Sequence, residues 1–282
     1  MSDITGPVRR LERFYGEMTS VDAVLRALAK DMAPDKVSAA DLYTRSLDCQ
    51  NHGGFEMLQR IAGLAAEHAG LDGTSQVLDA GCGIGGPGRY LADRFGCTVT
   101  GIDLLPERIR VAAALTRMVG LTDRVTYRRA DATDLPFSDA AFDQVWMLDA
   151  SVHVTDKRGL FLQLARVLKP RGLLVMHEQM GPLPAAMRYV TRRAPYICPS
   201  LPQVLRYIEG GGFHLLLWHD TTRTIFERME DRREGLAKRA KEAVGADARR
   251  QQQRLALVKA YVDALSELGG SRTGILVARR VA

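Results

Sequence analysis

Acidic side chains follow five successive predicted strands of this 282-residue chain. Each stands where an apolar run ends, and helical stretches separate the runs; the five residues are Asp79, Asp103, Asp131, Asp149 and Glu178. Strands that alternate with helices predict right-handed crossovers and a parallel sheet. Ligands of such sheets bind at the carboxyl ends of the strands. We therefore expect these side chains to surround one binding site.

A glycine-rich turn joins the first strand to a helix expected over residues 89–95; the stretch reads Val77-Leu-Asp-Ala-Gly-Cys-Gly-Ile-Gly-Gly-Pro-Gly88. Glycine allows positive φ angles and lets the backbone approach a ligand without an intervening Cβ. The helix presents its N-terminal N–H groups and the positive end of its dipole above the turn. The stretch is therefore suited to hold a small ligand with an anionic or polar part.

Two classes of cofactor use such a turn. The dinucleotide pattern is satisfied by Gly81-x-Gly83-x-x-Gly86, with Asp103 about 20 residues further on. Asp79 argues for the second class, because a carboxylate two residues before the first glycine would repel a pyrophosphate. The same carboxylate suits a ligand that carries a positive ammonium and a sulfonium group.

The residues Asp79-Ala-Gly81-Cys-Gly83-Ile-Gly85-Gly resemble the first motif of the class I S-adenosylmethionine-dependent methyltransferases. The resemblance is strong over residues 75–180, and its form is similar to the tocopherol, sterol side-chain, sarcosine/dimethylglycine and natural-product methyltransferases. It implies S-adenosyl-L-methionine as cofactor. It also implies an α/β fold: a Rossmann-like, seven-stranded, mostly parallel sheet with a reversed last strand, helices on both faces and a helical cap.

The resemblance assigns the aminocarboxyl part of the cofactor to Asp79 and to the backbone of Gly81, Cys82 and Gly83. It assigns both ribose hydroxyls to Asp103, because two hydroxyl donors on one carboxylate make charge-assisted hydrogen bonds. An Asp that merely starts a loop in an Asx turn is the alternative interpretation.

The adenine and the reactive methyl group have implied partners further along the chain. Leu104 would pack on the adenine face, Asp131 would accept from the adenine amino group, and the Ala132 N–H would bond to the ring. Leu148 and Asp149 follow the fourth strand, where the resemblance places the methyl group; Asp149 is a candidate for the substrate.

Residues 42–54 form a polar stretch that ends in two glycines. In similar methyltransferases such a segment lies across the methionine end of the cofactor and helps to form the substrate mouth. Tyr43 is therefore a candidate for cofactor binding, and Asn51 and His52 are candidates for substrate binding. A tight turn with capping residues explains the same composition.

Two residues are candidate general bases. His153 lies in a His-x-x-Asp segment that resembles one common in small-molecule members; it could instead be a buried histidine bonded to Asp156 or to backbone. Glu178 follows a buried apolar strand, and a carboxyl at the mouth of an apolar pocket can have its pKa raised toward neutrality, which suits proton abstraction.

The rest of the pattern completes the fold. Further strands are expected over 98–102, 125–128, 142–148, 173–177, 213–221 and 274–278. Helices are expected over 55–69, 106–119, 157–168, 202–209, 225–244 and 248–268, with one or two more within 8–33. We expect the chain to divide into an N-terminal helical lid (1–70), a cofactor-binding core (71–180), a substrate cap that holds the sixth strand (181–270) and the final strand of the core (271–282).

Aromatic residues mark the expected cap. Tyr189 and Tyr196 stand in a proline-rich linker and Trp218 in the sixth strand, so these three are candidates for a pocket that takes a mostly apolar or cationic metabolite. The net charge of +6 is concentrated after Gly181, which fits solvated helix faces or an acidic substrate. No nucleic-acid-binding motif accompanies that charge.

Composition limits the remaining possibilities. The N-terminus lacks the apolar stretch of a signal peptide, and no segment is apolar enough to cross a membrane. The four cysteines have no metal-ligand spacing, so we expect a cytoplasmic protein without a catalytic metal. A homodimer stays open.

The sequence therefore predicts methyl transfer to a small organic metabolite by in-line displacement. The acceptor atom, carbon, nitrogen or oxygen, stays open. Two other functions remain: a cofactor-binding relative that transfers no methyl group, and a nicotinamide-dependent oxidoreductase.

Overall fold

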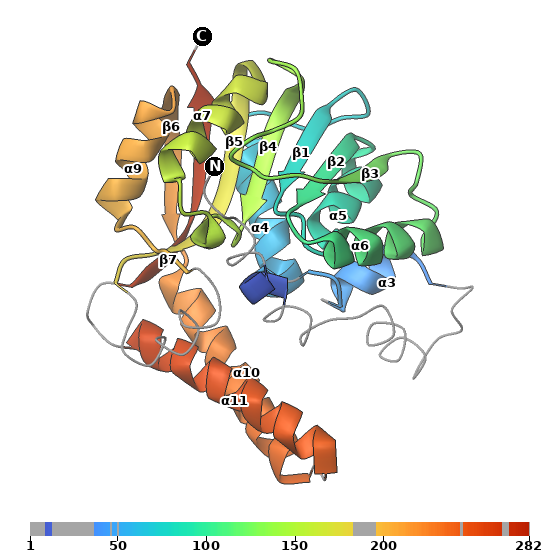
Figure 1. Cartoon of the computed structure of the whole chain (residues 1–282), viewed down its shortest axis with the longest axis vertical. Helices are drawn as coiled ribbons and strands as arrows, with labels where there is room; N and C mark the ends of the chain where they lie inside the picture. The colour runs from blue at the N-terminus through green and yellow to red at the C-terminus, as the bar shows by residue number, and fades with distance from the viewer. Residues whose placement is uncertain are drawn as a thin grey trace.

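The computed structural model describes residues 9–12, 37–45, 47–49, 51–182, 196–242, 245–266 and 271–281. Its centre is a seven-stranded sheet of order β3-β2-β1-β4-β5-β7-β6 (Figure 1). The strands are β1 (Gln76–Ala80), β2 (Thr98–Asp103), β3 (Val125–Arg129), β4 (Phe142–Leu148), β5 (Leu168–Met180), β6 (Phe213–Asp220) and β7 (Arg272–Arg280). The first five pair in parallel, and β7 runs antiparallel to β5 and β6. The predicted fold class is confirmed.

Side chains that alternate along the strands build one core on each face of the sheet. Val175 belongs to the core beneath α4 (Gly54–Ala66) and α5 (Gly86–Phe95). Its neighbour Leu174 belongs to the core beneath α7 (Lys157–Val167) and α9 (Leu201–Gly210). Successive side chains of a strand point to opposite faces of the sheet. Helices cover both faces of β5, and its side chains are therefore apolar on both faces.

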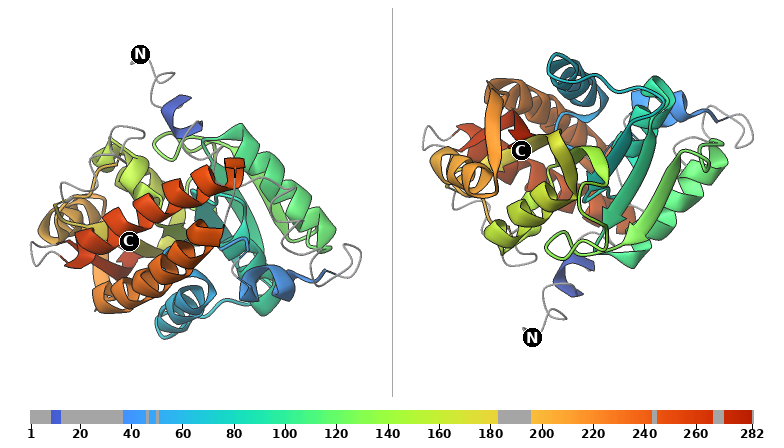
Figure 2. Two further views of the ribbon diagram at one scale, coloured as in Figure 1. Left: turned by 90° about the horizontal axis from the view of Figure 1, so that it is seen from below. Right: turned by 90° about the horizontal axis from the view of Figure 1, so that it is seen from above.

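Two long helices, α10 (Thr222–Glu242) and α11 (Gly245–Ser266), connect β6 to β7. They lie side by side and extend past the end of the sheet (Figures 1 and 2). Gly245, with φ of +61°, is the first residue of α11 and lies where the sequence predicted a break between two helices. Arg228 of α10 pairs with Glu56 of α4 at 2.8 Å and so ties this helical pair to the core. Two further helices are α3 (Ala39–Thr44) and α6 (Pro106–Met118).

The fifth strand is longer than the predicted 173–177. The helix before it ends at Val167, and the chain enters β5 at once, with Leu168 paired to Phe142. The register then shifts before Gln144 pairs with Leu173. Arg171 takes a φ of +65° in this irregular stretch. The sequence signal began only after the irregularity, which is why the prediction started late.

Of the helices expected within 8–33, only residues 9–12 are among those described, and they are helical. Tyr189 also lies outside the described residues. Within the described part of the chain, no helix combines the length and the apolar character that crossing a bilayer requires.

Candidate cofactor and active site

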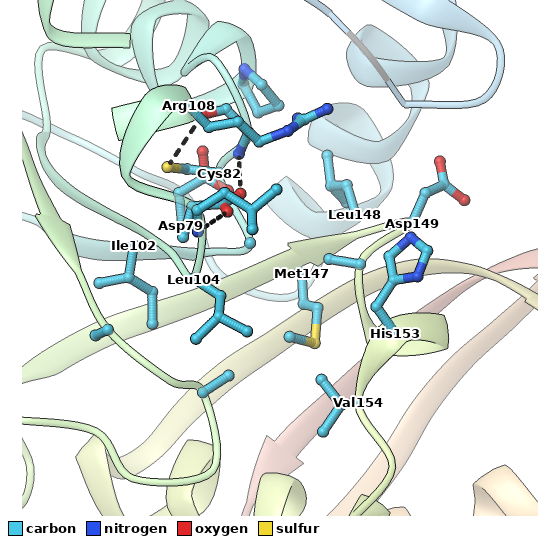
Figure 3. Close-up of a pocket in the computed structure, with 18 of the residues that line it drawn as sticks. Asp79, Cys82, Ile102, Leu104, Arg108, Met147, Leu148, Asp149, His153 and Val154 are labelled. Carbon is cyan, nitrogen blue, oxygen red and sulfur yellow. Dashed lines mark hydrogen bonds between the residues drawn. The ribbon is translucent and has the colours of Figure 1, made fainter. Parts of the chain in front are cut away.

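One cavity lies at the carboxyl ends of β1, β2 and β4, beside the point where the strand order reverses between β1 and β4. Figure 3 shows Asp79, Cys82 and Arg108 toward one end of it and His153, Asp149 and Val154 toward the other. The predicted residues that line it are Asn51, Asp79, Gly81, Cys82, Gly83, Asp103, Leu104, Asp131, Ala132, Leu148, Asp149 and His153. Ligands of open α/β sheets bind in this position.

The glycine turn is held against the end of β2 by its own backbone. The N–H groups of Gly81 and Cys82 both donate to the Ile102 carbonyl at 2.8 Å, and the Gly83 N–H donates to Oδ2 of Asp103 at 3.1 Å. Gly81 has a φ of +78°, and a Cβ there would overlap Ala150 in the loop after β4. These N–H groups are used within the protein. The turn therefore lets a ligand come close to the backbone, but these three N–H groups already donate to atoms of the protein.

Asp79, next to the last residue of β1, is a buried carboxylate with an unused acceptor. Its residue is 2% exposed, and its Oδ2 has no hydrogen-bond partner in the described structure. Burial raises the pKa of Asp79 to about 7; the charge of Asp103 adds to the increase, and the Gly88 N–H opposes it. A buried acceptor of this kind fits a ligand that brings a positively charged donor.

Asp103 and Asp131 both form turns after their strands and both face the cavity. Oδ1 of Asp103 accepts from the Leu105 N–H at 2.9 Å, so each of its oxygens holds one backbone donor. A carboxylate has about four acceptor positions, which leaves room for two hydroxyl groups. Oδ1 of Asp131 accepts both the backbone N–H and the hydroxyl of Thr133, at 2.8 and 2.7 Å. The Asx-turn interpretation thus holds for both residues and excludes neither from ligand binding.

The Asp149 carboxylate lies within hydrogen-bond distance of two histidines, His52 and His177. The residue has a φ of +53°, which is unusual for a residue other than glycine. Its carboxylate accepts the His52 N–H at 2.6 Å and lies 3.0 Å from His52 Nδ1 and 3.2 Å from His177 Nδ1. Burial would raise the pKa of Asp149, but the two histidines outweigh burial and hold that pKa far below its usual range. Burial opposes protonation of His52, yet the charge of Asp149 raises the pKa of His52 overall.

His177 extends this cluster into the interior. Its Nε2 lies 3.0 Å from the Thr221 hydroxyl, and the Thr221 and Thr273 hydroxyls are 3.1 Å apart. His177 was not predicted as a site residue, because it lies inside an apolar strand and its sequence pattern does not distinguish it from a core residue. Asp48 and Arg108 also line the cavity and were also missed. Arg108, in the first turn of α6, moderates the pKa increase that burial imposes on Asp103.

Glu178 lies beneath the loop after β4 and does not line the cavity. Its Oε1 accepts the Ala150 and Ser151 N–H groups at 3.2 and 2.8 Å. Burial raises the pKa of Glu178 to about 7; the charge of Asp149 contributes, and Lys157 opposes the increase. The carboxyl is therefore not at the mouth of the pocket, where the sequence placed it.

His153 does line the cavity, in a short 3₁₀ helix (Ser151–His153). Its ring packs edge-on against Tyr196, with 5.5 Å between the ring centroids. The Tyr196 hydroxyl donates to Gln179 at 2.9 Å. Asp156 instead caps α7, where its side chain accepts the Gly159 N–H at 2.8 Å.

The other predicted residues lie outside the cavity lining. The Tyr43 hydroxyl donates to Asp93 at 2.8 Å, and its ring packs against Phe55 and Tyr90. Trp218 lies on the edge strand β6, packed over Gly274 of the neighbouring β7. Within the described residues, no group of three or more His, Cys, Asp or Glu side chains could hold a metal ion. The expected absence of a catalytic metal stays a prediction.

Comparison with known proteins decides the family. A family model described as a methyltransferase domain matches residues 78–176. The 27-O-demethylrifamycin SV methyltransferase of Amycolatopsis mediterranei (strain S699) is 30% identical over 200 residues, which cover 67% of this chain and 72% of that protein. The chain belongs to the S-adenosylmethionine-dependent methyltransferases. The resemblance predicted from the glycine turn is confirmed.

Other members of this methyltransferase family match over shorter stretches. Methyltransferase GfsG of Streptomyces halstedii is 36% identical over 120 residues, 43% of each chain. The chain thus spans less than half the length of the first curated relatives that it matches. Among solved structures, the [4+2]-cyclase SpnF superposes with a TM-score of 0.69 at 27% identity and covers 86% of this chain and 94% of its own.

Proposed function

We propose that this protein transfers the methyl group of S-adenosyl-L-methionine to a small organic metabolite. The observation that carries the proposal is the buried, unpartnered Oδ2 of Asp79 at the carboxyl end of β1. An acceptor there attracts a cationic ligand and disfavours a pyrophosphate, which argues against the nicotinamide alternative. Family membership supports the same conclusion.

Different residues around the cavity contact different parts of the cofactor. Asp79 faces the aminocarboxyl part, and Asp103 accepts the ribose hydroxyls with its remaining acceptor positions. The adenine is faced by Leu104, Ala132 and Asp131. Asp131 would use Oδ2, since its Asx turn occupies Oδ1. The bound cofactor supplies a methyl group that its sulfonium sulfur already activates. The protein's main task is then to align the acceptor atom and to exclude water.

His153 is the general base of this proposal, and it takes the proton of an acceptor hydroxyl or acidic C–H group. It is the candidate that lines the cavity, beside Leu148 and Asp149. Glu178 is then a positioning residue, because its carboxylate holds the backbone of Ala150 and Ser151 just before His153. Asn51, His52 and Asp149 border the substrate side.

A second function deserves a test because of SpnF. That structural relative is a [4+2]-cyclase, so the family fold with 27% identity also serves a reaction of another class. The alternative is that this chain binds the cofactor and catalyses a different reaction on its metabolite.

Calorimetry tests the proposal against the nicotinamide alternative, and a label-transfer assay tests it against the second function. Calorimetry should show that S-adenosylhomocysteine binds and NAD does not; the opposite result would overturn the proposal. Tritiated S-adenosylmethionine incubated with the protein and a metabolite extract should then label an extractable product. Binding of the cofactor product without any transferred label, over a broad set of extracts, would favour the second function. If the acceptor loses a proton, His153→Ala should lower the rate of labelling by roughly 100- to 10,000-fold while S-adenosylhomocysteine still binds.

A further inference from the structure

Residues 51–54 form a tight turn at the edge of the cavity, and His52 joins this turn to the loop after β4. Asn51 and Asp149 line the cavity, whereas His52 does not. The backbone N–H of His52 donates to Oδ2 of Asp149 at 2.6 Å, and the ring Nδ1 of His52 lies 3.0 Å from Oδ1. The two residues are 97 positions apart in the sequence. Their contact therefore holds together two segments of the cavity wall that the chain does not connect locally.

The turn is also attached to the protein before His52. Oδ2 of Asp48 pairs with Arg89 of α5 at 2.9 Å, and both side chains are 0% exposed. Inside the turn, the Asn51 side chain donates to the Gly54 carbonyl at 3.2 Å, and the Gly54 N–H donates to the Asn51 carbonyl at 3.1 Å. An arginine stays protonated at every accessible pH, whereas a histidine changes its charge near neutrality. The contact of His52 is therefore the attachment that can respond to pH.

Helix α10 packs against the same turn. Arg228 of this helix donates to the Gly53 carbonyl. Thr221, the last residue before the helix, has its hydroxyl 3.0 Å from Nε2 of His177, and Nδ1 of His177 lies 3.2 Å from the Asp149 carboxylate. Asp149 thus links the turn, the start of α10 and the loop after β4.

The charged groups around His52 come from several elements. Burial opposes protonation of its ring, but the Asp149 carboxylate outweighs burial and raises the pKa of His52 above its usual value. Arg232 of α10 opposes this increase and Glu178 of β5 adds to it, while His177 of β5 faces the same carboxylate. A group with a raised folded pKa contributes stability that is complete below its unfolded value of 6.5 and is lost as the pH rises through the folded value. The contact should therefore be strong in acid and weaker in alkali.

We propose that the His52–Asp149 contact is a pH-dependent switch, which holds residues 51–54 closed on the cavity while the His52 ring is protonated. The protonated ring adds a full positive charge to its hydrogen bond with the carboxylate, and such bonds are the stronger kind. Closure of this wall helps to exclude water from the cavity. His52 is a positioning residue, because it acts on the cavity through Asp149. The inference goes beyond the proposed function, since closure of the ligand-free protein does not depend on the reaction.

The test follows the ring and the backbone of the turn by NMR in the ligand-free protein. The His52 ring should titrate above pH 6.5. Hydrogen exchange of the His52 and Gly54 amides, corrected for the intrinsic effect of pH, should become about tenfold faster across the same titration, the usual difference between a hydrogen bond with charged partners and a neutral one. Amide exchange that does not follow the titration of the ring would overturn the inference, and so would a ring that titrates at or below pH 6.5.

Variants at position 52 separate the switch from a merely structural contact. His52→Asn keeps a side-chain donor close to the position of Nδ1 but cannot be protonated, so its corrected exchange should not change with pH. His52→Ala should exchange fast at every pH. His214→Asn is the matched control, because it removes an exposed histidine of the edge strand β6 and should keep the wild-type behaviour. A pH dependence that persists in His52→Asn would also overturn the switch. All these measurements use protein without ligand, so a negative result leaves the proposed function intact.

Discussion

The protonation of Asp79 should make cofactor binding depend on pH. Burial raises the pKa of this carboxyl to about 7 in the structure without ligand, where its Oδ2 has no partner. A cationic ligand binds the ionised form, so the affinity should fall as the pH falls through that value. With a pKa of about 7, roughly one carboxyl in eleven is ionised at pH 6 and ten in eleven at pH 8. The dissociation constant should therefore differ by about tenfold between these two pH values.

Ionisation of Asp79 strengthens ligand binding but lowers the folding stability of the ligand-free protein. Its folded pKa lies above the unfolded value of 3.8, so the folded state holds the proton more tightly. The stability that this group contributes is complete below pH 3.8 and is lost as the pH rises through about 7. A saturating ligand should reduce that loss, because it stabilises the ionised form.

Calorimetry in paired buffers of different ionisation enthalpy measures the affinity and the number of protons released on binding. Binding of S-adenosylhomocysteine to the wild-type protein at pH 7 should release about half a proton from Asp79, as its pKa requires. Asp79→Asn should bind more weakly and lose the pH dependence. Glu178→Gln is the matched control: the pKa of Glu178 is also raised to about 7, but that carboxyl does not line the cavity, so its removal should leave the dependence in place. An affinity that stays constant from pH 6 to pH 8, without proton release, would refute the reasoning.

Three further predictions concern the cofactor, the base and the fold. Asp103→Ala should weaken S-adenosylhomocysteine binding by about 2–4 kcal/mol, because two charge-assisted bonds are lost; an unchanged dissociation constant in calorimetry would contradict the ribose assignment. His153→Ala should lower kcat by roughly 100- to 10,000-fold if the acceptor loses a proton, with Glu178→Gln acting less strongly through the loop that it holds; equal kcat values and pH profiles in both variants and the parent would remove the base from the mechanism. Arg89→Leu should destabilise the protein by about 3–5 kcal/mol in urea unfolding, because it leaves a buried carboxylate unpaired. Arg110→Leu breaks an exposed ion pair and should cost under about 1 kcal/mol; similar losses in both variants would be the contrary result.

The sequence could predict the cofactor end of the site because its signals are local. Asp79 and Asp103 lie at the carboxyl ends of β1 and β2, and parallel strands bring their carboxyl ends together whatever the side chains do. The glycine turn was recognisable for the same reason, since its φ angles depend on residues next to one another in the chain.

Contacts between distant segments were not predictable in the same way. The ion pair of Asp48 with Arg89 spans 41 residues, and nothing in the local pattern of either residue indicates the other. Glu178 was misplaced because its direction depends on the face of β5 that it occupies: its neighbour His177 points to Asp149, and Glu178 points to the loop before His153. Trp218 was assigned to a pocket by its chemical type, whereas the strand order places β6 at the far edge of the sheet.

Position 149 joins backbone conformation to acid–base chemistry in a single residue. Its left-handed φ of +53° would be relaxed by glycine, and a substitution chosen only to stabilise the backbone would favour that change. Glycine would also remove the carboxylate that accepts from the His52 backbone and raises the pKa of its ring. Asparagine tolerates the same backbone region and would keep the turn without the charge. Comparing the two variants would separate conformational strain from electrostatics. A glycine that raises the thermal stability at this position would also change the protonation of His52.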